Sequence, residues 1–379
     1  MRFDTLAVHG GERVPGPEGS VVFPIFQGTV FTVEPGSDYH DIKYPRLNST
    51  PTQTYLHDKL AALEGAEAAV ATSSGMAAVT TILHTLLGTG DHLLVGDGLY
   101  GGTHDFLTKH AARLGWEYTV IDTHDPSSWE ARANTKAVLV ETITNPLMRV
   151  GRHREVVAFA RANGLTSVVD NTFASPVNFR PIAAGFDLVF NSATKYLNGH
   201  SDVVAGTVAG AAALVEQVRH TQNLYGGSLD PHAGYLLSRG LKTLGVRVRQ
   251  QNANAHAMAE FLSGHPKVAA VNYAGLPDHP DHAHAAELLN GFGGMVSFRM
   301  AGGLEAAEVL LSALTLPAVA PSLGGVETLI TRPALTSHAG MSPADRATAG
   351  ITDDLIRLSV GIEDSEDLTD DFARALDKV

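Results

Sequence analysis

Short apolar runs alternate with amphipathic stretches between about residues 55 and 240. Helical periodicity fits residues 54–64 and 75–87, and a further helix is predicted over 155–163, where Gly164 follows as a plausible C-cap. The apolar runs predict seven buried strands, over residues 68–71, 93–95, 118–121, 137–140, 167–169, 188–190 and 203–208. Strands that alternate with helices predict an α/β domain with a mainly parallel seven-stranded sheet.

The pattern changes on both sides of this region. From about residue 241 it predicts a long helix over 246–262 and strands over 268–273, 295–300 and 355–360, as in a smaller α+β domain. Residues 1–50 are interrupted by glycine and proline and are predicted to be irregular, but their apolar side chains indicate burial, for example against a partner subunit. The predicted organisation is an N-terminal arm over 1–50, a larger ligand-binding domain over 51–241 and a C-terminal domain over 242–379.

Composition and charge narrow the classes of function. The chain has 379 residues, of which 44% are hydrophobic and 18% charged, as in an ordinary globular protein. Its 27 basic and 40 acidic residues give a formal net charge of −13, which makes nucleic acid or an anionic membrane an unfavourable partner. It contains no cysteine, which excludes disulfides, thiolate nucleophiles and cysteine metal sites.

No segment predicts export, membrane insertion or metal binding. The first residues lack the apolar core of a signal peptide, and the longest apolar stretches, such as 203–215, are broken by glycine and too short to span a bilayer. We therefore expect a cytoplasmic protein without a membrane partner. His282 and His284 alternate on a loop-like stretch without a matching acid cluster, so we expect no metal site.

A lysine and an aspartate follow two neighbouring predicted strands. Lys195 comes after the run 188–190, and Asp170 directly follows the run 167–169. Ligands of parallel sheets bind beyond the carboxyl ends of the strands, where both residues fall. This pair suits pyridoxal 5′-phosphate, because a lysine can form a Schiff base with its aldehyde and an aspartate can keep its pyridine nitrogen protonated. Taken alone, Lys195 could be a surface lysine and Asp170 a turn or cap residue.

The small residues around Lys195 leave room for such a ring, and Ser192 and Thr194 can hydrogen-bond its phosphate. A second phosphate-binding segment is predicted at Ser74-Gly75-Met76, which opens a helix where N–H groups and the helix dipole favour an anion. Gly75 would allow close approach of the backbone. The alternative is a simple helix cap.

Two further residues are candidates for ring and substrate contacts. Tyr100 could stack on the pyridine ring, although a core aromatic near a turn is the simpler interpretation. Arg357 lies inside an apolar strand and needs an anion, either a substrate α-carboxylate or an internal acid. His200-Ser201-Asp202 contains the residue types of a hydrolase triad, but consecutive residues cannot form the required relay.

Together these motifs resemble the PLP enzymes of cysteine and methionine metabolism. This family includes cystathionine γ-synthase, cystathionine γ- and β-lyases, methionine γ-lyase and O-acylhomoserine sulfhydrylases. The resemblance covers nearly the whole chain and rests on Tyr44-Pro45-Arg46, Ser74-Gly75-Met76, Leu99-Tyr100-Gly101-Gly102-Thr103, Val169-Asp170-Asn171-Thr172, Ser192-Ala193-Thr194-Lys195-Tyr196, Gly199-His200-Ser201-Asp202, Arg239-Gly240-Leu241-Lys242-Thr243-Leu244, Ser322-Leu323-Gly324-Gly325 and Leu355-Ile356-Arg357-Leu358-Ser359.

The resemblance implies fold type I of the PLP-dependent transferases, as in aspartate aminotransferase, and a homotetramer built from two catalytic dimers. It implies that Lys195, the Schiff-base lysine and proton shuttle, acts with Tyr100 and Tyr44 in catalysis. The implied cofactor contacts are Asp170 at the ring nitrogen, Tyr100 on the ring, Gly75, Met76, Ser192 and Thr194 at the phosphate, and Tyr44 and Arg46 from the neighbouring subunit. The implied contacts of the substrate α-carboxylate are Asn145 and Arg357, with Ser322 beside them.

Departures from the family pattern bear on the substrate. Gly102 replaces a cysteine usual in methionine γ-lyases, and Asp105 replaces an arginine usual in γ-synthases and γ-lyases. Pro321 replaces a glutamate common in the γ enzymes. Because Asp105 suits a distal ammonium group, the leading hypothesis is a C–S lyase that cleaves L-cystathionine by γ- or β-elimination.

Several other functions stay open. The alternatives within the family are cystathionine γ-synthase, an O-acylhomoserine sulfhydrylase and methionine γ-lyase. A fold-related aminotransferase is opposed by the arm segment 44–46, and a non-enzymatic binding protein is opposed by the intact Lys195 and Asp170.

Overall fold

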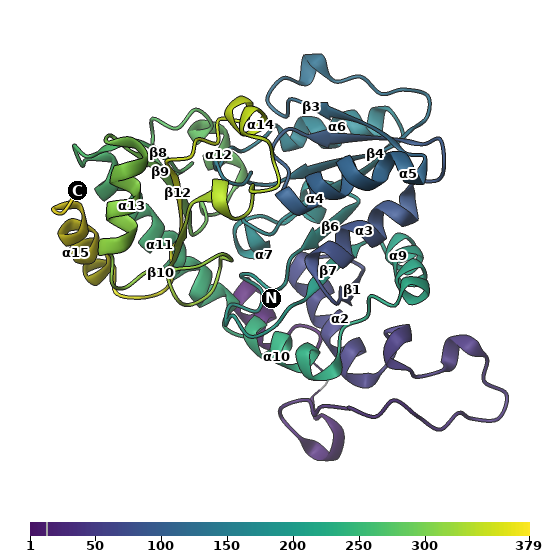
Figure 1. Ribbon diagram of the computed structural model, residues 1–379. Helices are drawn as coiled ribbons and strands as arrows, with labels where there is room; N and C mark the ends of the chain where they lie inside the picture. The colour runs from purple at the N-terminus through teal and green to yellow at the C-terminus, as the bar shows by residue number, and fades with distance from the viewer. Residues whose placement is uncertain (13) are drawn as a thin grey trace.

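Two β-sheets lie side by side in the computed structural model, which describes residues 1–12 and 14–379, and of His40 the main chain only (Figure 1). The larger sheet is built from the first part of the chain and the smaller one from the last part. No helix within the described ranges is long and apolar enough to cross a membrane.

The larger sheet has seven strands in the order β1-β7-β6-β5-β4-β2-β3. All are parallel to one another except β7, which runs antiparallel to β1 and β6. This confirms the predicted α/β fold with a mainly parallel sheet. The strands are β1 Ala68–Thr72, β2 His92–Gly96, β3 Glu117–Ile121, β4 Thr135–Glu141, β5 Thr166–Asp170, β6 Leu188–Asn191 and β7 Gly206–Gly210.

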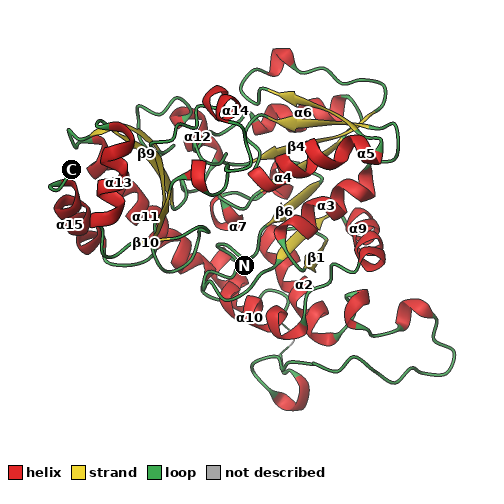
Figure 2. Cartoon of the chain, viewed as in Figure 1, coloured by secondary structure: helices red, strands yellow, loops and turns green. Residues whose placement is uncertain are grey.

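Helices cover both faces of this sheet (Figure 2). Alternate side chains of β4 enter two different cores: Val138 and Val140 pack with α2, α6 and α10, whereas Ala137 and Leu139 pack with α3 and α9. The helices of this region are α2 Pro51–Glu64, α3 Gly75–Leu86, α4 Gly101–Phe106, a π-helical turn Leu107–Ala111, α5 Ala112–Leu114, α6 His153–Ala162, α7 Ser175–Asn178, α8 Pro181–Ala184, α9 Ala212–Tyr225 and α10 Pro231–Leu241.

The smaller sheet has five strands in the order β10-β11-β12-β9-β8, antiparallel except for the β10–β11 pair. A separate core joins its inner face to α11, α13 and α15. Its strands are β8 Val268–Asn272, β9 Met295–Met300, β10 Ala318–Val319, β11 Leu329–Thr331 and β12 Leu355–Ser359, and its helices are α11 Leu244–Ser263, α12 His282–Leu288, α13 Gly303–Ala313, α14 Pro343–Thr348 and α15 Ser365–Leu376.

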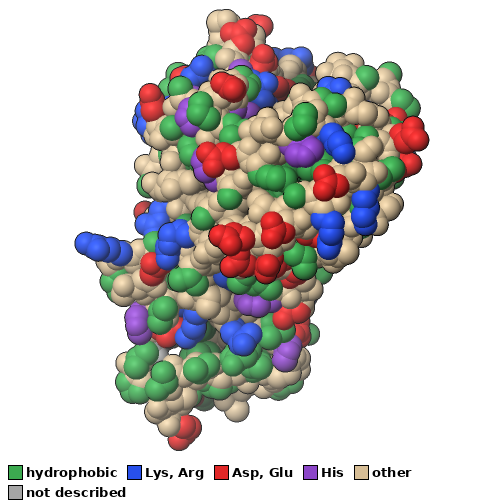
Figure 3. All heavy atoms as spheres, turned by 90° about the vertical axis from the view of Figure 1, so that its left-hand side faces the viewer, with side chains coloured by type: hydrophobic (Ala, Val, Ile, Leu, Met, Phe, Trp, Pro, Cys, Tyr) green, Lys and Arg blue, Asp and Glu red, His purple; other side chains and the backbone are tan. Residues whose placement is uncertain are grey.

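The N-terminal residues form one short helix and an extended arm. Helix α1, Phe3–His9, packs near α2 and α11, whereas the sequence predicted no regular element before residue 50. The arm that follows contains 3-10 turns at Pro17–Gly19, Tyr39–Asp41 and Pro45–Leu47, and extends away from the larger sheet (Figure 1). Hydrophobic side chains are visible on it at the lower end of the face in Figure 3.

Candidate active site

A cavity of about 650 Å³ lies beyond the carboxyl ends of β4, β5 and β6, between the two sheets. This is the edge at which parallel sheets bind ligands. Ten of the residues predicted for cofactor and substrate line it: Gly75, Met76, Tyr100, Asn145, Asp170, Ser192, Thr194, Lys195, Ser322 and Arg357.

Asp170 is the last residue of β5 and is half-buried. Burial raises the pKa of this carboxyl to about 6, even though Oδ1 accepts hydrogen bonds from Thr172 N at 2.9 Å and Thr172 Oγ1 at 2.5 Å. The ion pairs found among the described residues do not include Asp170. A half-buried acid that lines the cavity and has no cation partner fits the protonated pyridine nitrogen of pyridoxal phosphate.

Lys195 lies in the turn after β6, and its Nζ donates a hydrogen bond to Ser322 Oγ at 2.8 Å. Burial and the positive charge of Arg357 lower the pKa of the Lys195 amine to about 8. A buried lysine with a depressed pKa is partly neutral near physiological pH, which makes it able to attack an aldehyde and to accept a proton.

The N-terminus of α3 packs closely against the turn after β6. Ser74 caps this helix, because its Oγ accepts a hydrogen bond from Ala77 N at 3.0 Å. A Cβ at Gly75 would stand 2.8 Å from the Cβ of Ser192, so only glycine allows the two segments to approach this closely. Ser192 and Thr194 thus line the same space as the N-terminus of α3, as a phosphate site requires. Thr194 Oγ1 already donates to Ala205 O at 3.2 Å and accepts from Ala205 N at 3.0 Å.

Tyr100 stands at the start of α4, with its ring about half exposed to the cavity. A Cβ at Gly102 would stand 2.6 Å from Tyr100 Cε1 and 3.0 Å from Met76 Sδ. The glycine therefore leaves space for the aromatic ring, and a larger residue at this position would displace it.

Arg357 is buried in β12, the central strand of the smaller sheet. Its Nη1 donates to Asn145 Oδ1 at 3.1 Å and its Nη2 to the main-chain O of Ser322 at 3.1 Å, whereas Nε has no partner in the described structure. Burial lowers the pKa of the guanidinium to about 10. Among the described residues no acid forms an ion pair with Arg357, which favours a carboxylate ligand over the internal salt bridge.

Three predicted site residues do not line the cavity in this chain. Tyr44 is exposed on the arm, and Arg46 Nη1 donates to the main-chain O of Asn223 at 2.9 Å. Asp105 forms an exposed ion pair with Lys109, with Nζ and Oδ2 2.6 Å apart. The roles predicted for these residues stay predictions.

Glu141 was not among the residues predicted from sequence, although it lines the cavity. It ends β4 directly opposite Asp170 in the register of the parallel pair. The same signal that drew attention to Asp170, an acid at the end of an apolar strand, could have identified it.

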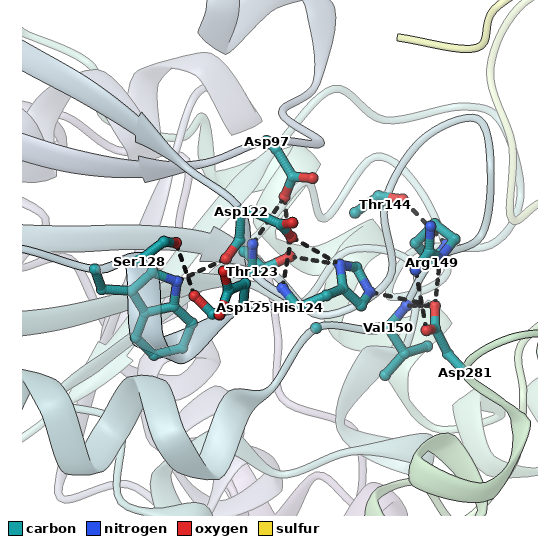
Figure 4. A network of polar contacts seen from close by, with 12 residues as sticks. Asp97, Asp122, Thr123, His124, Asp125, Ser128, Thr144, Arg149, Val150 and Asp281 are labelled. Carbon is teal, nitrogen blue, oxygen red and sulfur yellow. Dashed lines mark hydrogen bonds and ion pairs between the residues drawn. The ribbon is translucent and has the colours of Figure 1, made fainter.

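A polar network supports the loop that carries Asn145 (Figure 4). Asp281, in the chain segment after β8, accepts hydrogen bonds from Arg149 Nε at 2.6 Å and Val150 N at 3.0 Å, and its Oδ2 lies 3.3 Å from His124 Nε2. Thr144 and Arg149 also close the loop, because Thr144 N donates to Arg149 O at 2.9 Å and Arg149 N donates to Thr144 Oγ1 at 3.1 Å.

Potential metal ligands also meet in this network, where atoms of Asp97, Asp122 and His124 lie within 4.8 Å of one another. Thr123 donates to Asp97 Oδ1 from both N and Oγ1, and the main-chain N of His124 donates to Asp122 Oδ1. Since these carboxylates are engaged by protein donors, the grouping is explained without an ion.

Comparison with known proteins places this geometry in context. Residues 4–377 match the family described as Cys/Met metabolism PLP-dependent enzyme. The chain is 42% identical to cystathionine γ-lyase of Bacillus subtilis, with 100% of both chains covered, and 40% identical to L-methionine γ-lyase of Porphyromonas gingivalis, with 100% of this chain and 97% of the relative covered. It is 39% identical to the chloroplastic cystathionine γ-synthase 1 of Nicotiana tabacum, with 99% and 72% covered.

Solved structures of related enzymes superpose on the whole chain. Cystathionine γ-lyase from Lactobacillus plantarum complexed with L-serine superposes with a TM-score of 0.94 at 36% identity, with 100% of this chain and 99% of that chain covered. Cystathionine γ-synthase from Xanthomonas oryzae pv. oryzae, in complex with aminoacrylate and cysteine, superposes with a TM-score of 0.95 at 40% identity, with 100% and 98% covered. The predicted fold type is therefore confirmed over the whole chain.

Proposed function

The chain belongs to the Cys/Met metabolism PLP-dependent enzymes, and on this premise we propose that it is a lyase that cleaves a C–S bond of L-cystathionine. The reaction is γ-elimination, with β-elimination as the variant, and yields a thiol-containing amino acid, a 2-oxo acid and ammonia. The observation that carries the proposal is the cavity in which the Lys195 amine and the unneutralised Arg357 guanidinium face the same space.

Pyridoxal phosphate is the cofactor, and the cavity suits it. Asp170 would hold the ring nitrogen, Tyr100 would cover the ring, and the phosphate would lie between the N-terminus of α3 and the hydroxyls of Ser192 and Thr194. When bound, the cofactor supplies an aldehyde that links to an amine and a protonated ring that accepts the electron pair released at the substrate Cα.

The protein residues bind the amino acid and move its protons. Arg357 and Asn145 would bind the α-carboxylate, which fixes the Cα–H bond relative to the Lys195 amine. Lys195 would remove the Cα proton as general base, since its depressed pKa leaves part of the amine neutral. For γ-elimination a further proton leaves Cβ before the γ-thiol departs, whereas a β-thiolate departs without this step.

Product analysis tests the proposal. The purified protein would be incubated in parallel with cystathionine, methionine, cysteine and O-acylhomoserine, and the oxo acids, thiols and ammonia measured. Cystathionine should give 2-oxobutanoate with cysteine for γ-cleavage, or pyruvate with homocysteine for β-cleavage. Lys195→Ala serves as the control and should give neither. Turnover of the other substrates without cystathionine cleavage would refute the assignment.

A second candidate is γ-replacement, as in cystathionine γ-synthase or an O-acylhomoserine sulfhydrylase. The charged residues that line the cavity are Glu141, Asp170, Lys195 and Arg357. The part of the wall formed by Pro321, Thr336 and Ser337 carries no charge. An uncharged wall favours a neutral distal group, which also keeps methionine γ-cleavage open. Incubation of O-acylhomoserine with cysteine or sulfide separates replacement from elimination by the condensed product.

Asp105 provides a test of the distal group. If Asp105 binds the distal ammonium of cystathionine, Asp105→Ala should raise KM for cystathionine more than KM for methionine, which lacks that group. Lys109→Ala is the matched control, because it removes the observed partner of Asp105 and leaves the carboxylate available. Equal changes in both KM values for Asp105→Ala would remove the argument for a cationic distal group.

A further inference from the structure

Glu141 contacts the main chain of two segments that the proposed function requires. Its Oε1 accepts a hydrogen bond from the main-chain N of Tyr100, at the start of α4. The main-chain N–H of Asn145 also favours the charged form of this carboxyl group and lowers its pKa, as a nearby donor does. One side chain at the end of β4 therefore links the residue that would cover the ring to the residue that orients Arg357.

The burial of Glu141 is not compensated by an ion pair within the described residues. Glu141 is 9% exposed and takes part in none of the ion pairs found among residues 1–12 and 14–379. Burial and the neighbouring charge of Asp170 raise the pKa of the Glu141 carboxyl well above its ordinary value. Burying a carboxyl group costs free energy. We therefore expect a buried acid where the fold needs its oxygens as hydrogen-bond acceptors.

We propose that Glu141 is a positioning residue that sets the Tyr100 and Asn145 segments together, so that the ring site and the α-carboxylate site keep one fixed spacing. This inference rests on the proposed function, because it takes the cofactor and carboxylate roles of these segments as given. Glu141 acts through main-chain groups of its neighbours and touches no reacting atom in this scheme.

The test compares Glu141→Ala with Glu141→Gln. The alanine removes both carboxyl oxygens that face these main-chain N–H groups, whereas the glutamine keeps one acceptor oxygen in place and resembles the protonated acid. We expect Glu141→Ala to weaken pyridoxal phosphate binding to the cofactor-free protein about tenfold or more, and Glu141→Gln to restore it to within about threefold of the wild type, since each buried N–H left unpaired is costly. Fluorescence titration of the cofactor-free protein measures both.

The second readout compares the change in KM with the change in kcat under steady-state conditions. Displacement of Asn145 should raise KM for the amino acid in Glu141→Ala by a larger factor than it lowers kcat, because the α-carboxylate site loses its geometry. Glu64→Gln is the matched control, as Glu64 is also buried with a pKa raised to about 7, but its Oε1 accepts from Asn191 and contacts neither segment. It should leave cofactor affinity and KM unchanged.

Cofactor affinity and KM that are unchanged in Glu141→Ala would overturn the inference. So would equal losses in the alanine and glutamine variants, or an equal loss in the Glu64 control. Failure of the proposed function looks different, because the wild-type protein itself would then bind no pyridoxal phosphate or cleave none of the four amino acids.

Discussion

The Nζ atom of Lys195 has two roles, since it must attack an aldehyde and later carry protons. The protein meets both by burial and by the nearby Arg357 charge, which together lower the pKa of the amine to about 8. Ser322 Oγ accepts one of its N–H bonds and so orients the amine toward the cavity. The same two features make the reactivity of this lysine dependent on pH.

We expect the rate at which pyridoxal phosphate attaches to the cofactor-free protein to increase as the pH rises through about 8, because only the neutral amine attacks the aldehyde. In Arg357→Leu the midpoint should move to higher pH, since one cause of the depressed pKa is removed. Stopped-flow absorbance measures the rate, with Lys195→Ala as the blank. A midpoint near that of an ordinary lysine in the wild type would contradict this prediction.

Arg357 is expected to determine affinity for the α-carboxylate. Replacement by leucine should raise KM by about 10- to 100-fold, the value of a charge-assisted hydrogen bond in a buried site. Arg299→Leu is the control, because Arg299 lies on the adjacent strand β9 but is half exposed and paired with Asp354. Steady-state kinetics of both variants should show a changed KM only in the first.

At the scale of elements, the site depends on how a loop of the larger sheet is tied to the C-terminal part of the chain. The loop after β4 presents Asn145 to Arg357, and its far end is held by Asp281 through Arg149 and Val150 (Figure 4). Burial tends to raise the pKa of Asp281, but hydrogen bonds from His124 and Arg149 overcome this and hold the pKa below its ordinary value. Asp281 in turn raises the pKa of His124.

Asp281→Asn should therefore lower the stability of the protein by about 1–2 kcal/mol, because it removes the buried carboxylate that pairs with the partly exposed Arg149 and His124. It should also raise KM, since the Asn145 loop is released. Thermal denaturation midpoints and KM values check both effects. Asp122→Asn is the control, as the exposed Asp122 contacts the same His124 ring at 3.4 Å and should have a small effect.

The difference between wild type and Asp281→Asn should depend on pH. The contribution of Asp281, whose pKa is lowered on folding, is present above about pH 4 and is lost as the pH falls below that value. The contribution of His124, whose pKa is raised, is present below about pH 6.5 and is lost as the pH rises further. Denaturation midpoints should thus differ most between about pH 4 and pH 6.5, and a constant difference would contradict this.

The apolar pattern was sufficient to predict the seven strands of the larger sheet, because the inner strands are buried on both faces, and the edge strand β3 still carries the apolar run that ends at Ile121. It was wrong at ends set by local hydrogen bonds. Helix α2 begins at Pro51 and not at residue 54, because Thr50 and Gln53 form a capping box. Strand β7 begins at Gly206 and not at residue 203, because the main chain of Ala205 bonds to Thr194.

The candidate site was predictable where a family motif and a strand end coincide, as at Lys195 and Asp170. The contribution of Glu141 depends on main-chain N–H groups of Tyr100 and Asn145, which no residue pattern encodes. Helix α1 was missed because Gly10 and Gly11, which end it, also suggested an irregular segment.

At the scale of the whole molecule, the N-terminal arm exposes apolar residues that a single chain does not cover. Val21 and Val30 are 79% and 89% exposed, whereas Phe23 stacks on Tyr55 with ring centroids 4.4 Å apart. Exposed apolar segments of this kind are typical of interfaces. We propose that the arm lies against a second copy of the chain, in a homotetramer formed by two catalytic dimers.

An interface of this kind has a consequence for catalysis, because Tyr44 and Arg46 lie on the arm and do not line the cavity of their own chain. If Arg46 completes the phosphate site of a partner subunit, Arg46→Ala and Lys195→Ala proteins should each be inactive or nearly so alone. Mixed after unfolding and refolding in equal amounts, they should recover about a quarter of wild-type activity, since half of the dimers are mixed and each mixed dimer holds one site with both residues intact.

A contribution of Arg46 within its own chain predicts the opposite result. Every site in a mixed dimer would then lack either Lys195 or Arg46, and mixing would restore nothing. Arg219→Ala paired with Lys195→Ala is the control, because Arg219 also donates to a main-chain carbonyl of the arm region, Leu47 O at 3.1 Å, from a helix of the same chain. The Arg219→Ala protein should be active alone, and mixing should not raise its activity per chain with an intact Lys195. Recovery of activity in the Arg46 mixture alone would identify the arm as part of the neighbouring site.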